Sequence, residues 1–233
     1  MPVTSVRYCR SRHYHHCKRN GIIQIEYMDR GRRIMKYKLT IEFREQDLKT
    51  IYEARQKVVI IKQTEIPTDI AVAWVCFSPF KSNTIEWEDD GYSIYASTSK
   101  IEDITIISKL HEENALSSIR YDYKDGPFNP PRELSVYCAG NCSEEFPQIT
   151  LGLSQNIVVN GVVYYNHPIN AFSVPYGQNV EMEAGKQISV LLRKNIVSSM
   201  LLPNDTNNII FNYSERPECT LSYNGYNKFL IKE

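Results

Sequence analysis

The sequence predicts a mostly β protein, an antiparallel β-sandwich of jelly-roll type with one short helix and a basic N-terminal arm. Many short β-prone runs are separated by turn residues, only one segment has helical spacing, and the first 20 residues are charged without hydrophobic periodicity. The length of 233 residues and the hydrophobic fraction of 42% fit a single folded domain. We therefore expect an arm at 1–20 and one domain at 21–233.

The first half of the chain contains the clearest strand pattern and the helix. Apolar and polar residues alternate strictly over 37–43, which predicts a strand with one face in the core. Segment 45–55 places its apolar residues at helical spacing and predicts the helix. Two apolar runs, 57–62 and 71–77, predict buried strands on either side of a loop at Pro67.

Turn residues organise the second half. Asn160-Gly161 suits a type I′ turn and predicts a hairpin over 156–165, and Asn224-Gly225 predicts a second hairpin near the end of the chain. The prolines of 126–132 exclude a strand interior and predict a connection between two halves of the domain. Further strands are expected at 84–88, 92–97, 104–110, 119–123, 134–137, 169–174, 180–183, 188–193 and 209–213.

Charge is balanced overall but divided along the chain. The 27 basic and 27 acidic side chains exclude binding of nucleic acid or an anionic membrane through net charge. Residues 1–38 hold ten Lys or Arg against two acidic residues, so the remainder is acidic, and the arm is expected to lie on an acidic surface of its own body or of another copy. A nucleic-acid-binding arm is the less favoured alternative. The residues expected to make the arm's contacts are Arg7, Tyr8, Arg10, Arg12, Tyr14, Lys18 and Arg19.

Cysteines and histidines raise the question of a metal or redox site. The segment 9–17 holds two cysteines and three histidines, but compressed spacing and nearby cations disfavour a tetrahedral zinc site. Cys138 and Cys142 could form a redox pair, half of a metal site or a local disulfide, although they lack the two-residue spacing of a thioredoxin motif. Free thiols are favoured, and the sequence predicts no cofactor.

No enzyme signature is present in the sequence. A phosphate-binding glycine loop, a nucleophile elbow, a His-Glu-x-x-His motif and a dinucleotide-binding glycine pattern are all missing, so we expect a protein that is not an enzyme. Trp87 and Tyr92 flank an acidic turn, where they could face a sugar ligand. The favoured alternative places Trp74 in the core and Trp87 in a cross-strand pair.

The expected function follows from the arm, the tyrosines and the missing signatures. Sixteen tyrosines suit protein interfaces and strands alike. We expect a self-assembling structural protein, as in an inclusion, an occlusion body or a coat, forming a homo-oligomer or lattice. The alternative is a lectin-like or toxin-like module that recognises a glycan or cell surface through its loops, and a third hypothesis is an unrecognised hydrolase. Because the sequence shows neither a membrane-spanning run nor a signal peptide, a cytoplasmic protein is expected.

Overall fold

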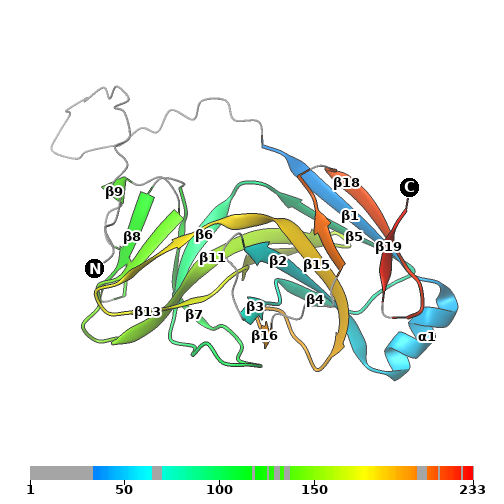
Figure 1. Cartoon of the computed structure of the whole chain (residues 1–233), viewed down its shortest axis with the longest axis horizontal. Coiled ribbons are helices and arrows are strands. Elements are labelled where there is room, and N and C mark those ends of the chain that lie inside the picture. Colours follow the sequence, from blue (N-terminus) through cyan, green and yellow to red (C-terminus); the bar gives the residue numbers. More distant parts are fainter. Residues whose placement is uncertain are drawn as a thin grey trace, which may run out of the picture. The chain divides into compact units, whose positions relative to one another are not determined.

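A computed structural model of the protein describes residues 34–64, 70–116, 119–124, 126–128, 132–133, 137–203, 209–214, 216–226 and 228–232 (Figure 1). From Ile34 onward these residues belong to one compact unit. Within them the chain is mostly β, with a single short helix, so the predicted fold class is confirmed. The predicted arm at 1–20 and its boundary lie outside the described residues.

The largest sheet is built around one long strand. Among the described residues its nine strands are β19 (Phe229–Ile231), β18 (Glu218–Tyr223), β1 (Lys36–Glu42), β5 (Ser82–Glu88), β11 (Gln148–Val159), β6 (Tyr92–Ser97) and β7 (Lys109–Asn114) in that order, with β12 (Val162–Pro168) and β13 (Phe172–Pro175) also paired to β11. Thr150 pairs with both β6 and β13, and Val158 pairs with both β5 and β12. β12 and β13 therefore lie along the side of β11 opposite to β5 and β6.

Three smaller sheets complete the described β structure. One contains β17 (Ile209–Asn212), β15 (Ala184–Lys194), β2 (Gln56–Thr64) and β4 (Val75–Phe77), a second contains β14 (Asn179–Met182), β10 (Tyr137–Asn141), β8 (Ile119–Tyr123) and β9 (Arg132–Glu133), and β16 (Leu201–Pro203) pairs with β3 (Ile70–Val72). Most neighbours are antiparallel, but β1 pairs with β18, and β8 with β10, in parallel. The sheets are thus mixed rather than wholly antiparallel.

The core lies between sheets packed face to face. The largest sheet contributes residues such as Leu39 and Leu153, and the β2–β15 sheet contributes Ile60 and Val190, all with at most 1% of their surface exposed. The other face of the β2–β15 sheet packs against the β3–β16 region in a second apolar cluster. Because β2 is covered on both faces, its central residues are apolar without alternation.

The predicted first strand and helix are confirmed. In β1 the alternate residues Tyr37, Leu39 and Ile41 are buried, as its periodicity requires. The helix α1 (Glu45–Glu53) buries Ile51 and lies beside β19 at one end of the unit (Figure 1). Within the described ranges no helix is both long enough and apolar enough to cross a membrane.

Three predicted elements differ from the structure. The run 71–77 is split into β3 and β4, because β3 pairs with β16 whereas β4 pairs with β2 in a different sheet. Between them, the Ala73 N–H donates to the Met200 carbonyl at 2.9 Å. The strand expected at 104–110 begins later, as β7, because Ile104 and Ile106 are exposed. The connection predicted at 126–132 overlaps β9, which begins at Arg132 and is an antiparallel neighbour of β8 in one sheet; its role between two halves of the domain stays a prediction.

Candidate functional site

The two aromatic residues predicted to face a ligand are buried. Trp87 is 4% exposed and Tyr92 is 6% exposed, so neither ring is open to a sugar at the surface. Trp87 instead stacks on its cross-strand neighbour Tyr37, with ring centroids 5.6 Å apart. This corrects the ligand-facing prediction and confirms the cross-strand alternative, because β5 turns that face of the sheet toward the core.

The side chain of Lys62 lies among three aromatic rings of the core. The Lys62 ammonium lies 5.2 Å from the Trp74 ring centroid, 4.8 Å from that of Tyr92 and 5.6 Å from that of Tyr213. Its Nζ donates to the Tyr92 hydroxyl at 2.8 Å and to Gln155 Oε1 at 2.7 Å. Since β2 belongs to one sheet and Tyr92 and Gln155 to another, Lys62 links the two sheets through the core.

The surroundings of Lys62 change its protonation. Burial lowers its pKa from 10.5 to about 7, while the negative charge of Asp89 acts in the opposite direction. A neutral amine is a nucleophile, yet the side chain is 2% exposed. A cavity of about 10 Å³ beside Lys62 and Asn170 has room for about one water molecule. Lys62 is thus arranged as a structural link between sheets, without space for a substrate.

Extended backbone keeps apart the two cysteines that were predicted as a redox pair or as half of a metal site. Cys138 lies in β10 and Cys142 directly follows it, so four extended residues hold their Cα atoms about 13 Å apart. A disulfide requires Cα atoms within about 7 Å. Both thiols are free, as favoured from the sequence, and burial raises the pKa of Cys138. Across the described ranges no group of His, Cys, Asp or Glu side chains could hold a metal ion.

The residues predicted to form the assembly arm cannot be placed. They are Arg7, Tyr8, Arg10, Arg12, Tyr14, Lys18 and Arg19, and all of them lie outside the described residues, as do the cysteines and histidines of 9–17. The described unit begins beside the acidic turn between β5 and β6. There the Met35 N–H donates to Asp89 Oδ1 at 2.9 Å, and Lys36 pairs with Glu88 at 3.4 Å.

One edge of the largest sheet exposes apolar side chains. In β12, Val162 is 57% exposed, Val163 is 42% exposed and Tyr165 is 72% exposed. Among the described residues β12 pairs with β11 alone, so its outer edge offers unpaired backbone groups. Asn160 and Gly161 have positive φ angles of 51° and 81°, which fits the predicted type I′ turn at the start of β12.

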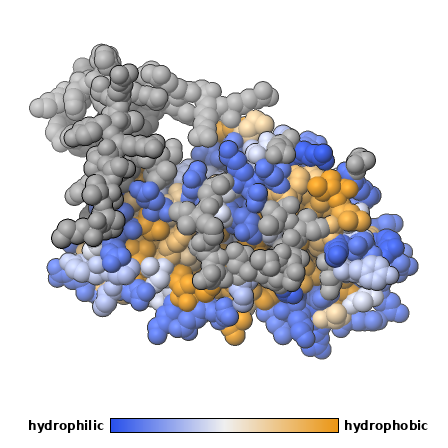
Figure 2. All heavy atoms as spheres, viewed as in Figure 1, coloured by the Kyte–Doolittle hydropathy of each residue, from blue (hydrophilic) through white to orange (hydrophobic). Residues whose placement is uncertain are grey.

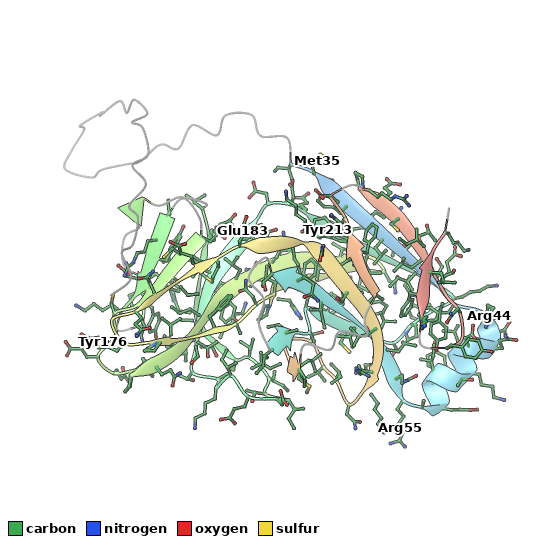
Figure 3. All side chains as sticks on the ribbon, viewed as in Figure 1. Met35, Arg44, Arg55, Tyr176, Glu183 and Tyr213 are labelled. Atoms are coloured by element: carbon green, nitrogen blue, oxygen red, sulfur yellow. The ribbon has the colours of Figure 1, made fainter. Side chains whose placement is uncertain are left out.

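A groove of about 270 Å³ lies between α1 and the turn that joins β18 to β19. Its polar lining includes Asp47, Thr50, Gln56 and Tyr223, with Tyr226 at its margin. Figure 3 shows Arg44 at the start of α1. Sequence reasoning identified the helix and the turn separately, but only the fold brings them together.

The surface drawn in Figure 2 is mixed, with hydrophobic atoms set among hydrophilic ones. No family model, curated protein or solved structure matches this chain.

Proposed function

We propose that the protein is a non-enzymatic structural protein whose copies associate along the outer edge of β12, as subunits of an inclusion or a coat. The observation that carries this proposal is the exposure of Val162, Val163 and Tyr165 on a strand whose outer edge pairs with no other strand among the described residues. A second copy of β12, antiparallel to the first, would supply the missing backbone partners and cover these side chains. Such a contact is self-complementary and fits a two-fold axis.

The distribution of charge supports association between copies. Residues 1–33 hold eight Lys or Arg against two acidic residues, whereas residues 34–233 hold nineteen against twenty-five. A basic segment and an acidic unit attract each other across copies and increase the rate at which copies meet. This attraction weakens as salt shortens the Debye length from about 10 Å at 0.1 M to about 3 Å at 1 M.

The interior supports a role other than catalysis. Lys62, whose pKa burial lowers, contacts aromatic rings and hydrogen-bonds to Tyr92 and Gln155. The cavity beside it has room for about one water molecule. His167, whose pKa burial lowers, hydrogen-bonds through Nδ1 to the Trp74 carbonyl at 3.1 Å. These groups connect elements of the core.

Light scattering of the full chain at rising concentration tests the proposal. At low salt we expect a mass above the 27.0 kDa of one chain. The double variant Val163→Lys, Tyr165→Lys places two cations at the edge of β12, and we expect it to remain a monomer with the wild-type circular dichroism spectrum. As a matched control, Leu110→Lys on β7, a second edge strand of the sheet, replaces a residue that is 51% exposed and should assemble like the wild type.

Two outcomes would count against the proposal. A wild-type chain that stays at the mass of one copy at every concentration would exclude self-association. A double variant that assembles like the wild type would exclude β12 as the contact. An assembly that persists unchanged in 1 M salt, but is lost in the double variant, would retain the β12 contact and remove the contribution of the basic segment.

A further inference from the structure

The groove between α1 and the β18–β19 turn is lined in part by the aromatic side chain of Tyr226. Tyr226 is 84% exposed, more than any other large hydrophobic side chain among the described residues. The turn that carries it is held by two hydrogen bonds, from the Asn224 N–H to the Lys228 carbonyl and from the Tyr226 N–H to Asn224 Oδ1, both 3.0 Å. An exposed ring beside the groove is available for stacking on a ligand.

Glycine at position 225 brings this turn close to the helix. Its φ is +88°, and a Cβ atom there would lie 2.9 Å from the Arg44 guanidinium and 3.4 Å from Asp47 Oδ1. The turn therefore packs directly over the ion pair at the start of α1. Tyr226 and the polar side chains of the groove are held on one small surface.

The charges at the groove neutralise each other. Arg44 Nε donates to Asp47 Oδ2 at 2.7 Å, and its terminal nitrogen donates to Oδ1 at 3.0 Å. Each carboxylate oxygen keeps a further lone pair that can accept a hydrogen bond. A cation would be repelled by Arg44 and an anion by Asp47, so the groove favours a neutral ligand that donates hydrogen bonds.

A second polar group beside Asp47 can both donate and accept. The half-buried amide of Gln56 has no hydrogen-bond partner among the described residues, and it offers one carbonyl oxygen and two N–H donors. Thr50 Oγ1 makes only a long 3.5 Å hydrogen bond to the Gln46 carbonyl, so its hydroxyl can be shared. Two neighbouring hydroxyl groups of a ligand match these partners. Each hydroxyl can donate one hydrogen bond to a carboxylate or amide oxygen and accept one from an amide N–H.

We propose that this groove binds a neutral pyranose, whose apolar face stacks on Tyr226 while two adjacent hydroxyls bind Asp47 and Gln56. The volume of about 270 Å³ is near the lower end of ligand pockets, which suits one sugar ring rather than a larger ligand. One stacked ring with a few hydrogen bonds predicts a weak Kd, on the order of 1 mM. This site is separate from the β12 edge and does not depend on self-assembly.

Saturation-transfer NMR on the full chain tests the site with glucose, galactose, mannose and N-acetylglucosamine as probes. We expect transfer to at least one pyranose, with a Kd at least tenfold weaker in Tyr226→Ala and in Gln56→Ala. Tyr176→Ala is the matched control, because Tyr176 is 52% exposed and lies at the opposite end of the described unit from Arg44 (Figure 3). It should bind like the wild type.

Three results would overturn the proposal. They are no transfer to any of the pyranoses, unchanged binding in a folded Tyr226→Ala variant, and equal transfer to cyclohexanol, which would indicate an apolar groove. The double variant Val163→Lys, Tyr165→Lys should retain sugar binding. This variant distinguishes the two proposals, because loss of assembly without loss of binding separates the β12 edge from the groove.

Discussion

Replacing Lys62 with methionine is expected to stabilise the protein below pH 7 and to destabilise it near pH 10. In the folded state burial lowers the pKa of Lys62 from 10.5 to about 7. Between these two pH values the unfolded chain binds more protons than the folded one, so the free energy of unfolding of the wild type rises with pH. Below pH 7 both states are protonated, and the full cost of burying the charge remains.

The size of the effect follows from the pKa change. The change corresponds to about 5 kcal/mol at 1.36 kcal/mol per pKa unit. Methionine removes this cost, but it leaves the Tyr92 hydroxyl and Gln155 Oε1 without their bonds to Lys62, which costs about 1–3 kcal/mol. The variant should therefore be the more stable protein by about 2 kcal/mol or more at low pH, and the less stable one at high pH, where its only effect is the lost bonds.

Urea unfolding of both proteins across this pH range measures the difference. Lys57→Met is the matched control, because Lys57 lies on the same strand, is half-buried and is an odd number of residues from Lys62, which places it on the other face. Its stability curve should run parallel to that of the wild type. If the curve of Lys62→Met also runs parallel to that of the wild type, the pKa of Lys62 is not lowered in the folded state.

Gly152→Ala is expected to destabilise the protein by about 3 kcal/mol or more. A Cβ atom at position 152 would overlap the backbone oxygen of Asn170 and lie 2.6 Å from the Tyr95 ring and hydroxyl. The Tyr95 hydroxyl donates to this same Asn170 oxygen at 2.6 Å in the core. Overpacking a core costs about 1–3 kcal/mol, and loss of a buried hydrogen bond adds about 1–3 kcal/mol.

The midpoint of urea unfolding measures this loss, with Gly91→Ala as the comparison. Gly91 has a φ of +73°, and no atom lies within 4 Å of its added Cβ, so only backbone strain of about 1–2 kcal/mol is expected there. Gly152→Ala should lower the midpoint more than Gly91→Ala does. A larger decrease of the midpoint in Gly91→Ala would show that the connection between β12 and β13, which contains Asn170, can move away from β11 without loss of stability.

Strands and turns with a clear local pattern could be predicted from the sequence alone. The alternation in 37–43 predicts β1 and its buried face, and Asn160-Gly161 predicts the turn before β12. The run 71–77 misleads because its residues are apolar throughout, and only the hydrogen bond from Ala73 to Met200 shows where the strand breaks. Apolar composition alone does not reveal contacts between distant segments.

In the candidate sites too, the local sequence predicts the burial of some residues and not of others. Period-two spacing puts Lys62 on the face of Val58 and Ile60, so its burial could have been inferred from the strand. The burial of Trp87 and Tyr92 could not, because adjacent sequence does not show which face of β5 or β6 another sheet covers. The groove at α1 joins segments more than 170 residues apart in the numbering, and local spacing carries no information about such a contact.

Amide hydrogen exchange of β12 at rising protein concentration tests the proposed pairing of copies most directly. In the part of one copy that the structure describes, no strand pairs with the outer edge of β12, so its outward amides should exchange quickly. We predict that protection of the amides of 162–167 increases with concentration, while protection of β7, another edge strand of the sheet, stays constant. Exchange of β12 that is the same at every concentration, in a solution where light scattering shows assembly, would contradict pairing along this strand.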